Sequence, residues 1–298
     1  MGYLFLAIAL LAGTTKGYCG KQISAQTRDP GSAAAVNLVR MVLCIVIGFG
    51  LVLAAGDTRK LLPRPELLLI MALSGVMTSV FVISWLLCVR KSAYMLVDVF
   101  LMLGALIPLL FGQILFREAV RPIQWVGFGV LVVAVLILCS HSSAIKGKLS
   151  LSGIALLILC GVSNGLTDFS QKLFSRYGAD SSVAVFNFYT YVFSAITLGV
   201  YSLLSSGGKS GGGGMQVLRS RRVLCFVAVM SVCLFLNSYF KTTAALYLDS
   251  MLLYPLNNCL ALAASTAMSA VLFGEKITLR AIVGLVLAAG ALLLIHVL

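Results

Sequence analysis

The fold is decided by two matching segments, "LFREAVRPIQWVGFGVLVVAVLIL" (residues 115–138) and "LFGEKITLRAIVGLVLAAGALLLI" (272–295), which superpose when the chain is slid by 157 residues. Seven of the 24 aligned positions are identical, among them Glu118 on Glu275 and a glycine pair. Chance agreement between apolar segments does not easily place a charged residue and a glycine in the same frame. The match therefore predicts an internal repeat.

The first helices of the two halves match as well. "LAGTTKG" (11–17) falls on "LCGVSNG" (159–165) at an offset of 148, and Asn37 falls on Asn187 at an offset of 150. The offset then grows by seven residues, where the second half carries the extra stretch "SSGGKSGGGG" (205–214). The predicted domains are a first repeat at 1–140, a linker at 141–149 and a second repeat at 150–298.

The composition is that of a membrane protein. Of 298 residues, 60% are hydrophobic and only 10% are charged, whereas about a quarter are charged in soluble proteins. Apolar runs of about 20 residues suit helices that cross a bilayer. We expect an all-α integral membrane protein with ten transmembrane helices, at about 2–24, 32–55, 66–89, 92–115, 122–140, 150–174, 181–205, 222–246, 250–272 and 279–297. The first is expected to be a retained span, because no basic region precedes it and no convincing cleavage site follows it.

An odd number of helices per repeat has a topological consequence. The second five-helix repeat must enter the membrane from the side opposite to the first, so the two are inverted repeats. Alternating-access transporters are commonly built in this way, with the binding site near the bilayer midplane.

Other functional classes find little support in the sequence. The formal charge of +13 is scattered through short loops, which predicts contact with the lipid bilayer and no nucleic-acid partner. Two distant histidines, His141 and His296, cannot form a metal site, and no cofactor is expected. The cysteines fall mostly in apolar spans, where they pack as small hydrophobic residues. No paired-carboxylate or triad arrangement indicates an enzyme.

Ionisable residues inside membrane spans are functional candidates by default. In the helix at 150–174, the spacing of Asn164, Asp168 and Lys172 places all three on one face. Asp168 could be neutralised by Lys172 or could titrate during transport. In the helix at 2–24, Lys16 aligns with Asn164 of the other repeat. A snorkelling lysine is the alternative, but the alignment favours a place in a cavity.

Further polar candidates lie on the remaining spans. Asp98 could pair with Lys16 or Arg40, or could reach the interface. With Asp168, it is a candidate for proton coupling. The other predicted substrate-binding residues are Asn187, Tyr191, Asn237 and Asn258, the last beside Asn257 and Pro255. Asparagines inside spans also hold helices together, so a purely structural role remains the alternative for each of them. Tyr191 could instead belong to an interfacial aromatic belt.

The segments "LIPLLFGQILFREAVRP" (106–122), "LYPLNNCLALAASTAMSAVLFGEKIT" (253–278) and "GLVLAAGALLL" (284–294), in this order and with two five-helix repeats, resemble the drug/metabolite transporter superfamily, specifically its EamA-type members. The resemblance covers essentially the whole chain. It implies a central cavity lined by the first four helices of each repeat, with the fifth helices at the sides, and transport without ATP. Arg40 matches a position where relatives often carry arginine, whereas Lys16 replaces a small or apolar residue.

Orientation is not fixed by these observations. The resemblance implies that both termini lie in the cytoplasm. The loops on the face opposite to the N-terminus, however, carry more lysines and arginines, and the positive-inside rule then favours the reverse orientation.

We therefore expect a secondary active transporter for a small organic metabolite or drug in the inner or plasma membrane. The alternatives are a membrane-embedded enzyme acting on a lipid-linked substrate and a non-transporting scaffold. The identity of the substrate, the coupling ion and the oligomeric state, with a homodimer as one option, are left open.

Overall fold

The structure is a computed structural model that describes residues 1–24, 26–27, 30–91, 94–117, 121–140, 151–206, 218–273 and scattered residues between Leu279 and Leu294. All regular structure in these residues is helical. The predicted linker, most of the glycine-rich stretch 205–214, Glu118, Glu275 and most of the last predicted helix lie outside the described residues.

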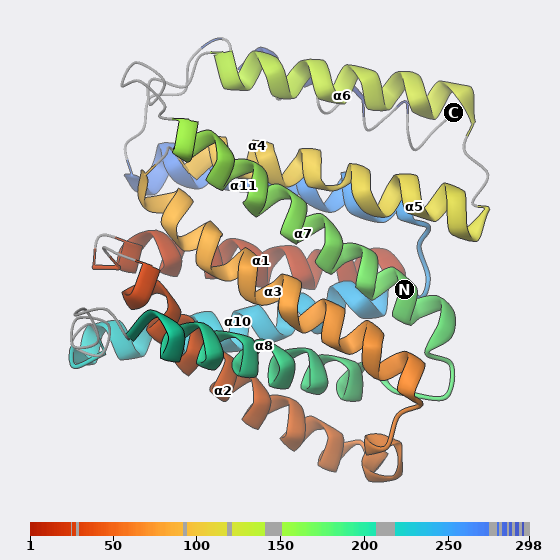
Figure 1. Cartoon of the computed structure of the whole chain (residues 1–298). Coiled ribbons are helices and arrows are strands. Elements are labelled where there is room, and N and C mark those ends of the chain that lie inside the picture. The colour runs from red at the N-terminus through yellow and green to blue at the C-terminus, as the bar shows by residue number, and fades with distance from the viewer. Residues whose placement is uncertain are drawn as a thin grey trace.

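The helices run side by side, with their connections gathered at the two ends of the molecule (Figure 1). As helices, most of the predicted segments are confirmed to within about three residues at each end. The helices are α1 (Gly2–Ser24), α2 (Pro30–Ala54), α3 (Pro65–Lys91), α4 (Tyr94–Gly104), α5 (Leu106–Phe116), α6 (Pro122–Ser140), α7 (Leu151–Tyr177), α8 (Val183–Ser206), α10 (Arg221–Ala244) and α11 (Ser250–Phe273).

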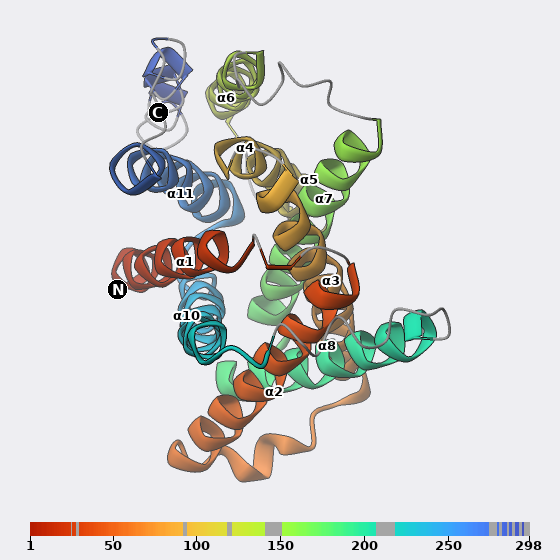
Figure 2. The same cartoon turned by 90° about the vertical axis from the view of Figure 1, so that its left-hand side faces the viewer.

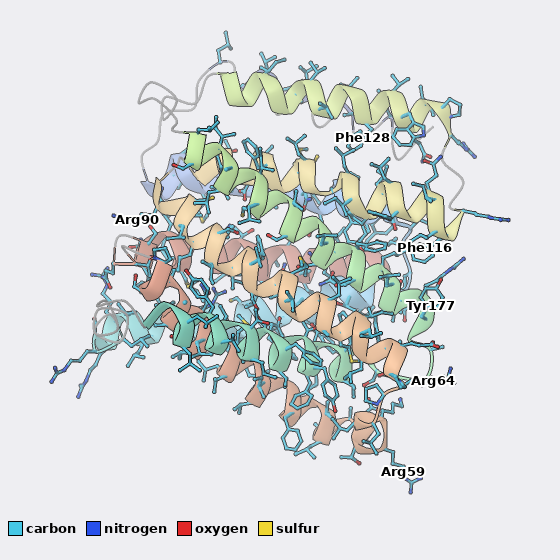
Figure 3. All side chains as sticks on the ribbon, viewed as in Figure 1. Arg59, Arg64, Arg90, Phe116, Phe128 and Tyr177 are labelled. Atoms are coloured by element: carbon cyan, nitrogen blue, oxygen red, sulfur yellow. The ribbon has the colours of Figure 1, made fainter. Side chains whose placement is uncertain are left out.

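Six of these helices are long and apolar enough to cross a bilayer, namely α2, α3, α7, α8, α10 and α11. Charged side chains lie at the two ends of the bundle, with Arg59 and Arg64 at one end and Arg90 at the other (Figure 3). An apolar middle between two charged ends indicates a multi-pass membrane protein.

The prediction of one continuous helix at 92–115 is wrong, because two helices, α4 and α5, meet there at Ala105. Pro108 has no N–H group and cannot bond to the Gly104 carbonyl four residues earlier. The Ala105 N–H instead donates to the Met102 carbonyl, three residues back, at 3.1 Å. The break leaves the Gly104 carbonyl available to a neighbouring helix.

The most extensive helix contacts join the two halves of the chain. The pairs are α1 with α10, α3 with α7 and α2 with α8. Figure 2 shows α1 lying along α10, and α2 crossing beside α8. α6 lies at the edge of the bundle, where Phe128 and Ala134 pack in a cluster with Met102, Leu109 and Leu262. The central part of the bundle is therefore built jointly from helices of both halves.

α4 and α7 cross with their backbones in contact. A Cβ atom at Gly104 would overlap the carbonyl oxygen of Gly161, and one at Gly165 would overlap the carbonyl oxygen of Gly104. Small residues spaced by four allow such an approach in membranes. Gly161 and Gly165 of α7 therefore permit the close approach of α4.

A short 3-10 helix, η1 (Asp57–Leu61), connects α2 to α3 at one end of the bundle. Lys60 contacts the Asp57 carboxylate at 2.9 Å, and Tyr189 of α8 donates to the Leu61 carbonyl at 2.6 Å. The hydrogen bond from Lys60, together with one from Ser182, holds the pKa of Asp57 below its usual range. These bonds tie the loop to the start of α8.

Candidate functional site

A polar cavity of about 80 Å³ lies inside the bundle and is lined by α1, α3, α4, α7, α10 and α11. A water molecule needs roughly 10–15 Å³ of such space, so the cavity can hold several waters. Its polar lining residues are Thr14, Lys16, Asp98, Asn164, Asn237, Lys241, Asn257, Asn258 and Ser265. Helices from both halves of the chain thus enclose one polar site.

Lys16 enters the cavity from α1 and is half-buried. Its Nζ lies 5.7 Å from the ring centroid of Phe81 and 5.8 Å from that of Trp85, both on α3. Cations at this distance from aromatic rings are stabilised by the negative ring faces. Among the described residues, no carboxylate comes within 4.0 Å of Lys16 in an ion pair, so the aromatic rings are its main support.

Asp98 lines the same cavity from α4 and is 7% exposed. Ser265 of α11 lies beside its carboxylate, and the positive charge of Lys16 acts on it. No ion pair to Asp98 forms within 4.0 Å in the described part of the chain. Lys16 and Asp98 are therefore two opposite charges that share a cavity with room for water, without direct contact.

Asp168 is completely buried and forms an ion pair with Lys241 of α10. The Asn164 amide lies 3.5 Å from the other carboxylate oxygen. The proposed pairing of Asp168 with Lys172 is wrong, because the Lys172 Nζ donates to the Leu248 carbonyl at 3.3 Å instead. Asp168 and Lys172 contact different neighbours although they lie four residues apart on α7. The charge of Asp168 is therefore neutralised by a residue of another helix, α10.

The asparagines form the polar wall of the cavity. The Asn237 amide donates to the Ala9 carbonyl of α1 at 2.7 Å, and the Asn258 amide donates to the Leu101 carbonyl of α4 at 3.1 Å. The Asn257 amide donates to Asn258, but its Oδ1 is buried with no hydrogen-bond partner in the described structure. A buried acceptor of this kind requires a donor from water or from a ligand.

Asn187 and Tyr191, which were predicted to contact substrate, lie outside the residues that line the cavity. The Asn187 Oδ1 accepts a hydrogen bond of 2.6 Å from Ser238 of α10, and the Tyr191 hydroxyl donates to the Leu234 carbonyl at 3.3 Å. Both bonds join α8 to α10. The structure gives Asn187 the helix-joining role that was its alternative. Tyr191, whose alternative was a place in an interfacial belt, is buried and joins the same two helices.

Arg40 is 1% exposed and also lies outside the cavity lining. Its guanidinium donates to the Asn37 Oδ1 one turn earlier on α2, while its Nε is buried without a partner. Its positive charge acts on Lys16. Arg40 therefore adds positive charge near the cavity without lining it.

Several residues of the site were not predicted from the sequence. Phe81 and Trp85 flank Lys16, and Thr14, Asn257 and Ser265 complete the lining. Asn257 could have been found from its place beside Asn258 and Pro255. The aromatic pair carried no signal, because α3 is apolar all round and its inward face cannot be distinguished from its lipid face.

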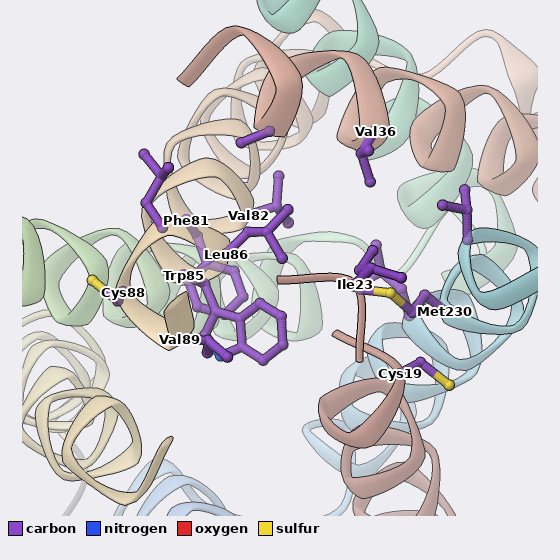
Figure 4. Close-up of a cluster of buried hydrophobic side chains, with 14 of the residues drawn as sticks. Cys19, Ile23, Val36, Phe81, Val82, Trp85, Leu86, Cys88, Val89 and Met230 are labelled. Atoms are coloured by element: carbon purple, nitrogen blue, oxygen red, sulfur yellow. The ribbon is translucent and has the colours of Figure 1, made fainter. Parts of the chain in front are cut away.

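Hydrophobic clusters lie beyond the cavity on both sides along the helix axes. Towards the ends of α1 and α3 lies the Trp85 cluster, shown in Figure 4, which includes Cys19, Ile23, Phe81, Val89 and Met230. In the other direction lies the Tyr254 cluster, formed by Leu6, Ala105, Ala244, Ala245, Leu253 and Tyr254. Along α1 the order is cluster, cavity, cluster, since Leu6 precedes Lys16 and Ile23 follows it.

Within the described residues, no group of three or more His, Cys, Asp or Glu side chains could hold a metal ion. The charged chemistry of the site rests on Lys16, Asp98 and the Asp168–Lys241 pair.

Comparison with known proteins supports the fold alone. No protein-family model matches the chain, and no curated protein matches it. Among solved structures, 28 chains match. One of them, a crystal structure, superposes with a TM-score of 0.72 over 99% of this chain and 96% of the other, at 15% sequence identity. The arrangement of helices is therefore shared with a protein of very different sequence.

Proposed function

We propose that this protein is a secondary active transporter of a small organic solute, in the inner or plasma membrane. The observation that carries the proposal is the buried polar cavity, which holds Lys16 and Asp98 between helices of both halves of the chain. Charged groups inside a membrane protein are costly unless they face water, a partner or a substrate. A pair of opposite charges held apart in a hydrated cavity is suited to binding a solute.

The helix pairing supports the interpretation as two inverted five-helix repeats, residues 1–140 and 150–298. In that division α1 and α7 are the first helices, α2 and α8 the second, and α3 and α10 the third. The contact of α1 with α10 then corresponds to the contact of α7 with α3, because each joins a first helix to the third helix of the other repeat. The contact of α2 with α8 joins the two second helices. Two halves that exchange equivalent contacts can rock against each other about a central site.

The two hydrophobic clusters fit the role of gates. The Trp85 cluster lies between the cavity and one end of the bundle, and the Tyr254 cluster lies between it and the other. Rocking of the repeats would open one cluster while the other stays packed. Trp85 belongs both to the gate and to the cavity wall, so ligand contact and gate packing are coupled through one side chain.

Asp98 is the better placed of the two candidates for proton coupling. It reaches the cavity, where water and substrate have access, whereas Asp168 is completely buried against Lys241. In the proposed mechanism Asp98 exchanges a proton with cavity water, and Asp168 and Lys241 keep α7 and α10 together. Lys16 binds the substrate.

Counterflow into proteoliposomes tests the proposal. Metabolites that raise the thermal stability of the purified protein are identified first, since a ligand of the folded state stabilises it. Each is then loaded unlabelled into vesicles, and uptake of its labelled form is measured. We expect accumulation that Lys16→Gln and Asp98→Asn reduce strongly. Lys21→Gln, on the same helix but outside the cavity lining, is the matched control.

The opposite outcome is equally clear. Stabilising metabolites that show no counterflow in any wild-type preparation, with the protein correctly folded and inserted, would indicate a receptor or scaffold and contradict the proposal.

A further inference from the structure

The buried charges of the bundle do not balance. Lys241 and Asp168 neutralise each other in their ion pair. The remaining ionisable groups around the cavity are Lys16, Arg40 and Asp98, which leaves one positive charge in excess among the described residues.

The excess is concentrated on Lys16. The positive charges of Arg40 and Lys241 both act on it, and among the described residues that line the cavity Asp98 alone carries an opposing charge. By the rise of an α-helix, Lys16 lies roughly 12 Å from the end of α1 at Ser24, and Arg40 roughly 15 Å from the start of α2. At such depth, the few waters that fit in the cavity solvate a charge less well than bulk solvent does. A negative ligand at Lys16 would remove this cost.

A second unsatisfied group lies in the same cavity. The Oδ1 of Asn257 is a buried acceptor without a partner in the described structure, and Asn257 is 8% exposed. A ligand that offers a hydroxyl group would satisfy it. The Phe81 and Trp85 rings and Leu101 supply an apolar wall for the remainder of the ligand.

We propose that the substrate is a small hydroxylated carboxylic acid, bound as its monoanion. Its carboxylate accepts hydrogen bonds from the Lys16 ammonium, and its hydroxyl donates to the Asn257 Oδ1. The single negative charge balances the single excess positive charge. This assignment rests on the proposed transport function and names the substrate class for the same cavity.

Four molecules of nearly equal size separate the possible ligand classes. Lactate carries the carboxylate and the hydroxyl, propionate lacks the hydroxyl, lactamide is neutral, and alanine replaces the hydroxyl by an ammonium group. The protein has two tryptophans, Trp85 and Trp125, and Trp125 lies on the peripheral α6. In a Trp125→Phe background, the emission of Trp85 reports directly on the cavity.

We expect lactate to change the Trp85 emission with an affinity about tenfold or more above that of lactamide, as for a charge-assisted hydrogen bond. Propionate should bind about fivefold more weakly than lactate, because it leaves the Asn257 acceptor unpaired. Lys16→Gln should remove the preference for the anion, and Asn257→Leu should remove the preference for the hydroxyl. Lys21→Gln should change neither.

Lys16→Arg is the control for the possibility that Lys16→Gln misfolds. It keeps the positive charge and should keep the preference for lactate over lactamide. Tighter binding of alanine or lactamide than of lactate overturns the inference, as does a preference for lactate that survives Lys16→Gln. Counterflow of some other solute, together with no binding of lactate or propionate, would leave transport established and the substrate class wrong.

Discussion

The crossing of α4 and α7 allows the sharpest prediction about the fold. Gly165→Ala places a methyl group where the carbonyl of Gly104 lies, and Ile107 closes the space on the same side. Because the obstacle is backbone, no rotamer change can relieve it, and the helices must separate. Overpacking of this kind costs about 1–3 kcal/mol of the free energy of unfolding. Gly104→Ala meets the Gly161 carbonyl and should cost a similar amount.

Gly199→Ala is the matched control, since a Cβ atom there meets nothing within 4 Å. Replacing a helical glycine by alanine in open space should stabilise by about 0.5–1 kcal/mol. Equilibrium unfolding in detergent micelles, followed by circular dichroism, compares the variants. Lactate affinity should also fall in Gly165→Ala, because Asn164 is adjacent on α7. Equal stability of Gly165→Ala and Gly199→Ala would refute the close backbone contact.

Further variants test three other parts of the structure. Asp168→Asn and Lys241→Gln should each lower the free energy of unfolding by about 3–5 kcal/mol, because each leaves a buried charge unpaired. The double variant should recover most of this loss in equilibrium unfolding. Strictly additive losses would contradict an ion pair between the two residues. Asn187→Ala removes the bond from Ser238 and should cost about 1–2 kcal/mol, with lactate affinity unchanged in the Trp85 titration. A loss of affinity at full stability would instead place Asn187 in the site. The lowered pKa of Asp57 means that its carboxylate stabilises the loop above its ordinary pKa of 3.8 and loses this effect as the pH falls through the folded-state value. Asp57→Asn should therefore have a lower thermal midpoint than the unmodified protein at pH 7 and a similar one under strongly acidic conditions; a difference independent of pH would contradict this.

Much of the fold was predictable because hydrophobicity and charged breaks define the limits of membrane helices. The limits of α1, α6 and α10 follow closely from the sequence. The break between α4 and α5 was missed although Pro108 marks it, because a proline in an apolar run can either kink a helix or end it. Which outcome occurs depends on the helix that packs against the freed Gly104 carbonyl, and this helix is α7, at Gly165.

The candidate site was predicted in part because ionisable residues are rare inside membrane spans. Lys16, Asp98, Asn164, Asn237 and Asn258 all line the cavity. The partner of Asp168 could not be derived from its own helix, since Lys172 and Lys241 are equally compatible with it until α10 is placed beside α7. Ionisable residues reveal that a polar site exists, whereas helix packing decides which groups meet in it.

Thiol accessibility of the cavity from both faces of the membrane is the most direct test of alternating access. Ala261→Cys is introduced into a protein whose eight native cysteines are replaced, and a membrane-impermeant methanethiosulfonate reagent is applied to one face at a time. Arg59→Cys and Arg219→Cys mark the two faces. Alternating access predicts that the thiol of Ala261→Cys is modified from either face and that lactate slows both reactions. Modification from one face only, with and without lactate, would contradict it.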